Sequence, residues 1–351
     1  MSATSADSAN HSGTPRESSP VTGPWRRYLR FSIRGLIVVV IVIATGLGWL
    51  VRRAQIQQAA VAAITNAGGS VTYDWQFKNG KLVSGARPWA PDWLVNSLGA
   101  DYFGHVAYVD FRPSSNPSVA VFAHLGRLTQ IEDLFAPTPS ITDDHLAHLE
   151  GMTKLNILVL DKTQVSDAGL VHLNGLTTLS YLSLSNTRVT DRGLKNLSGL
   201  SLWTLALNGT QVTDAGLDDL ARMRSLKGLG LSETAVTDAG LARLKELPDL
   251  SQLYLGETRV TDHGLTHLEG LTRAFAIDLR GTNVSDAGLA HLKGLNDLSW
   301  LQLDRTQVGD RGLIHLAGLK NLTRLNLVGA KVTDAGMNEL KQARPTMFIF
   351  R

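Results

Sequence analysis

Nine aspartates recur along the chain at a fixed spacing and are the first residues to consider for chemistry. Each belongs to the phrase Val/Ile-Thr/Ser/Gly-Asp-x-Gly/His-Leu/Met, and the spacing is 24 residues with a single step of 23. They are Asp143, Asp167, Asp191, Asp214, Asp238, Asp262, Asp286, Asp310 and Asp334. A column of carboxylates could bind calcium or act as catalytic acids. Each aspartate, however, precedes a short helical leucine pattern, where its carboxylate accepts from the free amides of the first turn, so we predict nine helix N-caps.

Five histidines form a second column at equivalent places of the same repeat. They are His148, His172, His267, His291 and His315. A metal site needs nitrogens that converge at about 2.1 Å from one ion, whereas packed helices lie roughly 8–10 Å apart. We therefore predict solvated or inter-helix histidines. No nucleophile with a base, pair of catalytic acids or phosphate loop stands apart from the repeat, so we expect no catalytic residue, metal or cofactor and no enzyme.

The elements that position these columns are read from the full repeat. The first part of the unit, with Leu179, Leu182 and Leu184, alternates inward leucines at period two, as a short strand does. Its second part spaces Leu194, Leu197 and Leu200 by three, as one face of a short helix does. Self-similarity at a period in the twenties predicts one strand–turn–helix unit stacked on copies of itself.

The repeated phrase resembles that of the F-box-type, or cysteine-containing, leucine-rich repeats, and is most similar to the short repeats of bacterial membrane-anchored proteins. Two departures are the absence of cysteine and of an upstream F-box. The expected fold is α/β: a leucine-rich-repeat solenoid with a curved parallel sheet on the concave side and short helices on the convex side, preceded by one transmembrane helix. The resemblance implies a recognition scaffold that binds protein through its concave sheet.

The repeats extend beyond the clear phrase. Residues 106–111 and 131–136 lie about one period apart before the first clear strand, and residues 348–350 follow the last helix, so we predict atypical terminal rungs there. A threonine ladder accompanies the strands and ends before Ala330. It comprises Thr163, Thr187, Thr210, Thr234, Thr258, Thr282 and Thr306.

The chain upstream of the repeats divides by composition. We predict a disordered tail at 1–24, a transmembrane anchor at 25–53 with a span of about 35–51, a helical stalk at 54–69, an N-terminal cap segment at 70–105 and the solenoid at 106–351. The apolar run ends in Trp-Leu-Val-Arg-Arg without a small-residue cleavage site, which favours an uncleaved anchor over a signal peptide. The aromatic residues of 70–105 are expected to cover the first rung.

Flanking arginines predict the orientation of the anchor. Four of them precede the span (Arg26, Arg27, Arg30 and Arg34) and two follow it (Arg52 and Arg53), which favours a cytoplasmic N-terminus and an exoplasmic or periplasmic repeat domain. The net charge of the first 53 residues is +5, which leaves −2 for the rest of a chain of net charge +3. The repeats therefore lack the basic footprint of a nucleic-acid binder.

Outward strand positions of the C-terminal rungs combine aromatic, arginine and acidic side chains, types that are common in binding hot spots. The predicted partner-binding residues, called here the concave patch, are Tyr254, Asp278, Arg280, Trp300, Gln302, Asp304, Arg305 and Arg324. Beside them, Gly228, Gly230 and Gly256 are expected to leave a shallow floor. The alternative functions are a cytoplasm-facing adaptor, an enzyme that depends on a polar pair such as Asp278 and Arg280, and a structural envelope protein. The alternative interpretation of the patch is an ordinary solvated strand face.

Overall fold

The computed structural model describes residues 33–351 except 79, 80 and 84. The chain divides into two compact units, Met1–Leu50 and Val51–Arg351. The predicted tail at 1–24 and Arg26, Arg27 and Arg30 lie outside the described residues.

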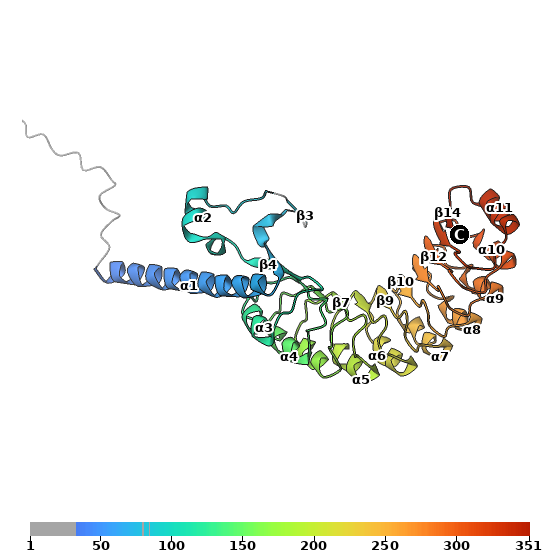
Figure 1. Ribbon diagram of the computed structural model, residues 1–351, viewed down its shortest axis with the longest axis horizontal. Coiled ribbons are helices and arrows are strands. Elements are labelled where there is room, and N and C mark those ends of the chain that lie inside the picture. The colour runs from blue at the N-terminus through green and yellow to red at the C-terminus, as the bar shows by residue number, and fades with distance from the viewer. Residues whose placement is uncertain (1–32, 79–80, 84) are drawn as a thin grey trace, which may run out of the picture. The chain divides into compact units, whose positions relative to one another are not determined.

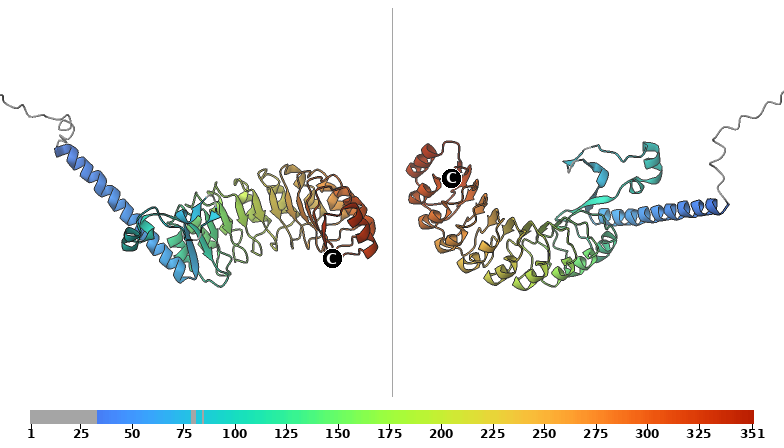
Figure 2. Two further views of the ribbon diagram at one scale, coloured as in Figure 1. Left: turned by 90° about the horizontal axis from the view of Figure 1, so that it is seen from above. Right: turned by 180° about the vertical axis from the view of Figure 1, so that it is seen from behind.

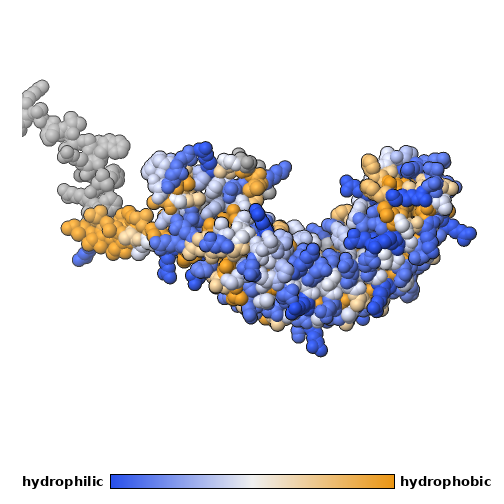
Figure 3. Space-filling model, viewed as in Figure 1, coloured by the Kyte–Doolittle hydropathy of each residue, from blue (hydrophilic) through white to orange (hydrophobic). Residues whose placement is uncertain are grey.

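Helix α1 (Ile33–Asn66) carries the apolar run. By length and composition it is long and apolar enough to cross a membrane, with a mean hydropathy of 2.3 over its most apolar window, none of which is buried. Its first turns expose side chains such as Leu36, Val38 and Ile41, and this part is the orange surface of Figure 3.

In the described part of the chain, twelve strands form one sheet in the order β1-β4-β5-β6-β7-β8-β9-β10-β11-β12-β13-β14. Strand β1 (Gly69–Tyr73) pairs antiparallel with β4, and β4 to β14 are parallel. The bounds are β4 Val106–Phe111, β5 Asp133–Phe135, β6 Ile157–Val159, β7 Tyr181–Ser183, β8 Thr204–Ala206, β9 Gly228–Gly230, β10 Gln252–Tyr254, β11 Ala276–Asp278, β12 Trp300–Gln302, β13 Arg324–Asn326 and β14 Phe348–Phe350. A small hairpin pairs β2 (Phe77–Lys78) with β3 (Lys81–Leu82).

Short helices connect the strands, because 24 residues leave room for only one or two helical turns per repeat. The α-helices are α2 Asp92–Leu98, α3 Val119–Leu125, α4 Asp143–Leu146, α5 Asp191–Leu194, α6 Leu217–Leu220, α7 Asp238–Leu241, α8 Asp262–Leu265, α9 Asp286–Leu289, α10 Asp310–Leu316 and α11 Asp334–Ala343. Single 3₁₀ turns follow several of them, and the repeat after β6 has the 3₁₀ helix η5 (Gly169–Leu173) instead. Within residues 51–351, the strands line the inner side of the curve and these helices its outer side (Figures 1 and 2).

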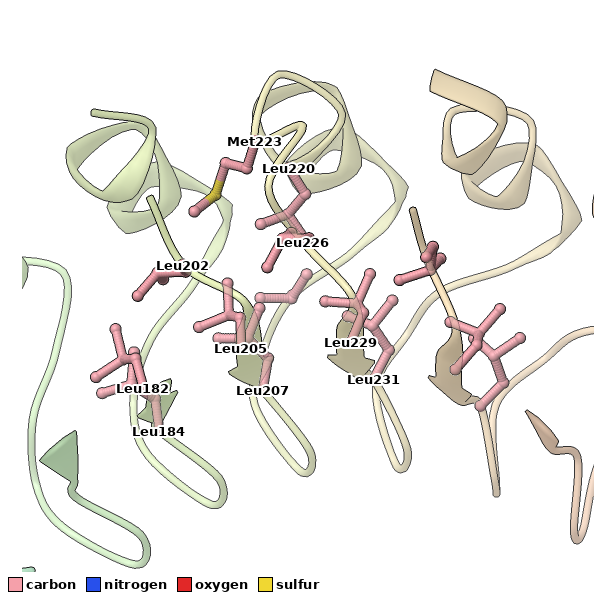
Figure 4. Packing of buried hydrophobic residues seen from close by; sticks show 14 of the residues in the cluster. Leu182, Leu184, Leu202, Leu205, Leu207, Leu220, Met223, Leu226, Leu229 and Leu231 are labelled. Carbon is pink, nitrogen blue, oxygen red and sulfur yellow. The ribbon is translucent and has the colours of Figure 1, made fainter. Parts of the chain in front are cut away.

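The core is a stack of leucine layers between the strands and the outer helices. Inward strand residues such as Leu205 and Leu229 pack with Leu220 of α6 and with Met223, which follows α6, in one cluster shown in Figure 4. Nearly all are fully buried. Each layer packs on the layers before and after it, so burial of apolar surface holds the rungs together. The α/β leucine-rich-repeat architecture expected from the sequence is confirmed.

The threonine ladder lies inside this core. Each hydroxyl donates to the backbone carbonyl three residues earlier, as Thr258 Oγ1 does to Leu255 O at 2.6 Å. The same bond forms at every rung from Thr163 to Thr306. The hydroxyl therefore closes the turn of its own rung and leaves no buried polar atom unpaired there.

The N-terminal end of the core is covered mainly by α1 and α3. Ala60 and Ile64 of α1 are fully buried, together with Phe122 of α3. Phe122 stacks on Phe111 of β4, with ring centroids 5.9 Å apart. Of the aromatic residues in 70–105, Tyr73 packs against the core, whereas Trp89 and Trp93 are exposed. The expectation that these tryptophans cover the first rung is therefore wrong. Residues of the predicted stalk, Ala60 and Ile64, cover it instead.

Candidate functional site

The aspartate column connects successive rungs. Asp167 Oδ1 accepts from the backbone amide of Thr190 at 2.8 Å, and Oδ2 accepts from the Thr190 hydroxyl at 2.6 Å. The same two bonds join six other aspartates to the Thr or Ser of the following repeat. Asp286 binds only the Gly309 amide, because Gly309 has no hydroxyl.

At every rung with the repeated aspartate except that of Asp167, the helix N-cap lies one residue before the aspartate. In the rung of Asp167 the N-cap is Ala168. Thr190 is the N-cap of α5, and its hydroxyl accepts from the amide of Arg192. Six N-cap hydroxyls accept from an amide of their own helix and donate to the aspartate of the preceding rung. They belong to Thr190, Thr213, Thr237, Thr261, Ser285 and Thr333. The prediction that the aspartates are N-caps is corrected on this point: Asp143 to Asp310 are inter-rung hydrogen-bond acceptors, and Asp334 forms an ion pair with Arg351.

The glycine of the repeated phrase makes room for this bond. A Cβ placed on Gly240 would lie 2.4 Å from Oδ1 of Asp214, and the equivalent glycine of every rung from Gly169 to Gly336 is approached in the same way. Aspartate and glycine are thus parts of one inter-rung contact. Nothing in this geometry points to catalysis, since each carboxylate is already held by structural donors.

Two of the five histidines in the column pair with glutamates. Nδ1 of His172 lies 2.6 Å from Oε1 of Glu150, and Nδ1 of His291 lies 2.6 Å from Oε1 of Glu269. Both pairs join neighbouring rungs on the outer face. Within the residues that the structure describes, no three His, Asp or Glu side chains come together to hold a metal ion.

The concave patch is assembled by the register of the parallel strands. Trp300 of β12 is aligned with Ala276 of β11 and Arg324 of β13, and Gln302 is aligned with Asp278. Because alternate residues of a strand share one face, these side chains lie together on the inner face of the sheet.

Two open hollows lie on this face and share a wall. The first has a volume of about 440 Å³ and is lined by Tyr254, Phe275, Ala276, Ser299, Trp300, Thr323 and Arg324. The second, of about 250 Å³, is lined by Trp300, Gln302, Arg324, Leu325, Asn326 and Phe350. Trp300 and Arg324 border both. The Trp300 ring meets Tyr254 edge-on at 5.9 Å between centroids, which holds both rings in place.

Polar members of the patch form a network that spans several rungs. Asp278 is only 3% exposed, accepts from the Arg280 amide at 3.0 Å and lies 3.4 Å from Arg280 Nε. Arg305 forms an ion pair with Glu257, two rungs away. The Glu257 carboxylate lies over Gly281, where a Cβ would be 2.5 Å from its atoms, so this glycine lets the pair form.

Two acceptors in the patch lack a donor. Gln302 Oε1 and Asp304 Oδ1 are buried atoms with no hydrogen-bond partner among the described residues, although Asn326 Nδ2 donates to the other Asp304 oxygen at 2.9 Å. An unpaired buried acceptor costs free energy. The patch therefore contains two buried, unpaired acceptors, and the Gln302 side chain that carries one of them lines the second hollow.

Burial raises the pKa of the Asp278 carboxyl, and Arg280 opposes that rise only in part. The folded protein thus holds a proton on Asp278 at a pH where the unfolded chain has lost it, and this stabilising effect is lost as pH rises through the folded pKa.

We expect Asp278→Asn to raise the urea midpoint at pH 7, because the amide removes the cost of burying a charge and keeps the oxygen that accepts from Arg280. The gain over wild type should shrink when the titration is repeated near pH 4. Asp297→Asn, which removes the same charge from an exposed position, is the control. A lower midpoint for Asp278→Asn at pH 7 would show that the Arg280 pair outweighs burial.

The expected glycine floor is absent. Gly228, Gly230 and Gly256 are buried, and the side chains of Thr204, Asn208 and Arg280 lie against them respectively. Sequence reasoning also missed Phe275, Ser299, Thr323 and Phe350, which line the hollows. Phe275, Ser299 and Thr323 each immediately precede a strand, β11, β12 and β13 respectively. An aromatic residue at this repeat position, Phe275, was the sequence feature that could have indicated them, and it is exposed.

Comparison with known proteins agrees with the repeat. Residues 175–198 and 318–340 match the family model described as Leucine Rich repeat. No curated protein sequence matches the chain. An internalin structure from Listeria monocytogenes has a TM-score of 0.52 and 27% identity over 65% of this chain, which spans 63% of that structure. A leucine-rich-repeat protein of Leptospira interrogans has a TM-score of 0.49 and 19% identity, covering 65% of this chain and 56% of that one. The matched segments coincide with the repeat that builds the sheet and the leucine core, so the chain carries leucine-rich repeats.

Proposed function

We propose that the chain is a non-catalytic recognition protein, held in a membrane by one helix, that binds a protein partner through the concave patch. Stacked repeats commonly provide such binding surfaces, because the inward positions are committed to the core and the outward strand positions are free to vary. The fold alone does not choose a partner, so the proposal depends on the chemistry of the patch.

The observation that carries the proposal is the position of Trp300 and Arg324 between two open hollows, next to the unpaired acceptors of Gln302 and Asp304. Tryptophan, tyrosine and arginine dominate binding hot spots, since they bury large areas and form directed contacts. A protein partner would fill the two hollows with its side chains and contact Trp300 and Arg324.

A photo-cross-linking residue at Thr323, inside the first hollow, tests for such a partner in host membranes. We expect a discrete product from Thr323 and none from the outer-face position Ser198. With the purified partner, Trp300→Ala should weaken binding at least 30-fold, which is about 2 kcal/mol. Trp203→Ala removes another exposed tryptophan and should leave binding unchanged. Equal products from both faces, or unchanged affinity of Trp300→Ala, would contradict the role of the patch.

The anchor is proposed at residues 35–51. Its support is the length, hydropathy and exposure of the first part of α1, together with the absence of a small-residue cleavage site where the apolar run ends. Arg34 and Arg52 border the run and are placed to extend their charges towards the headgroups.

We further propose a cytoplasmic N-terminus and an exoplasmic repeat domain. Because the chain has no cysteine, Ser198→Cys places a single thiol on the exposed outer face. We expect a membrane-impermeant maleimide to label it in intact cells whose outer barrier admits the reagent. Labelling only after the inner membrane is permeabilised would reverse the topology and favour a cytoplasm-facing adaptor.

A further inference from the structure

Helix α2 and the residue segment before it expose large apolar side chains that the repeat core does not use. Trp89 is 80% exposed, Trp93 is 69% exposed and Leu98 is also exposed. We call these three residues the α2 patch. Large exposed apolar side chains that are grouped on one short segment mark a surface that contacts another apolar phase.

The α2 patch is held in a defined position. The Trp89 ring meets Phe103 edge-on at 5.7 Å between centroids. At the start of α2, Arg87 Nη1 lies 2.6 Å from Asp92 Oδ2. These contacts orient side chains that remain open to the surroundings, so their exposure is not that of a loose loop.

The turn that follows α2 is attached to α1 just beyond the apolar run. Gln57 is buried, and its Nε2 donates to Asp101 Oδ1 at 3.0 Å and to Gly104 O at 3.3 Å. Arg53 Nη2 also donates to Gly104 O, at 3.4 Å. Tyr73 donates its hydroxyl to the same Asp101 oxygen at 2.8 Å. The α2 patch is thereby linked to residues 53–57.

Those residues lie close to the end of the proposed membrane span. Arg53 and Gln57 follow Val51 by two and six residues, which correspond to roughly 3 and 9 Å along a helix. The headgroup layer on each side of a hydrocarbon core is about 5–7 Å thick. The point of attachment is therefore within or next to that layer.

We propose that Trp89, Trp93 and Leu98 insert into the headgroup region of the bilayer that α1 crosses, as a second membrane contact. Tryptophan is enriched at this depth, because its ring is apolar while its N–H is satisfied by water or lipid oxygens. This inference rests on the membrane anchor of the proposed function. A protein partner could also cover the α2 patch, but attachment to residues 53–57 favours lipid.

The test uses the full chain in phosphatidylcholine vesicles and a single introduced thiol that carries an environment-sensitive fluorophore. Ser97→Cys places the fluorophore on the exposed surface of α2, and Ser198→Cys places it on a distant repeat as the reference. Lipids that carry a nitroxide near the headgroup quench a fluorophore at that depth. We expect quenching at position 97 to be several-fold stronger than at position 198.

Two sets of variants complete the test. Trp89→Ala combined with Trp93→Ala should reduce quenching at position 97 to the reference level, whereas Trp203→Ala, at another exposed tryptophan, should leave it unchanged. If the protein floats with the vesicles but position 97 is quenched no more than position 198, the second contact is refuted and the anchor stands. If the protein does not float with the vesicles, the anchor fails and the second contact fails with it.

Discussion

Replacing Leu229 by alanine is expected to destabilise the repeat domain by about 3–5 kcal/mol and to divide its unfolding into two steps. Leu229 is fully buried in β9, and its neighbours in the strand, Gly228 and Gly230, have no side chains. This one leucine therefore supplies the side-chain packing of its strand. Because each rung of a solenoid is stabilised by its neighbours, a weak central rung uncouples the two halves.

Hydrogen exchange along a urea titration of the full chain in detergent measures this effect. Peptides from β4–β8 and from β10–β13 should lose protection at different urea concentrations in Leu229→Ala and together in wild type. Leu325→Ala, at an equally buried position of β13, is the matched control. This substitution removes packing near one end of the sheet, so the central rungs should still unfold as one unit. A single transition in Leu229→Ala, with a loss below about 1 kcal/mol, would contradict the nearest-neighbour description.

Gly240→Ala is expected to cost about 2–3 kcal/mol, although alanine is the better helix former. The new Cβ would lie 2.4 Å from Asp214 Oδ1 and 3.0 Å from Leu217 Cδ2. Asp214 would have to turn away and lose its bonds to the amide and hydroxyl of Thr237, at 2.7 and 2.6 Å. The unfolding free energy of the variant in urea gives the cost.

Gly270→Ala is the control for this substitution, because nothing lies within 4 Å of the added Cβ. It should change stability little. A double-mutant cycle with Asp214→Ala isolates the contact: once the carboxylate is absent, Gly240→Ala should cost clearly less than in wild type. Additive effects would mean that the glycine is required for a reason other than the aspartate.

The solenoid was predictable from sequence because one hydrophobic pattern is repeated many times. Leu179, Leu182 and Leu184 of one rung recur one period later, so the period fixes strand, helix and register together. The same register aligns Trp300 with Arg324. The repeat period alone was therefore enough to predict that residues of the concave patch lie together.

The hydrogen bonds between rungs could not be predicted from the sequence. An aspartate at the start of a helix can accept from its own first turn or from the next repeat, and both choices leave the same residue pattern. Only the positions of Thr190 and Gly193 beside Asp167 decide between them. The segment before β4 has no period, so composition alone could not separate Tyr73, which packs on the core, from Trp89 and Trp93, which do not.

The inter-rung hydrogen bonds tolerate the loss or gain of one whole repeat. Removal of residues 167–190 would join Ser166 directly to Asp191. The bonds that Ser166 donates to Asp143 and those that Thr213 donates to Asp191 would both be kept. Unequal recombination between two copies of the repeat therefore removes or adds one rung, and each remaining aspartate from Asp143 to Asp310 still has a hydrogen-bond donor in the next rung. The distance from the first rung to the concave patch then changes in steps of about 4.8 Å, while the patch itself is inherited intact.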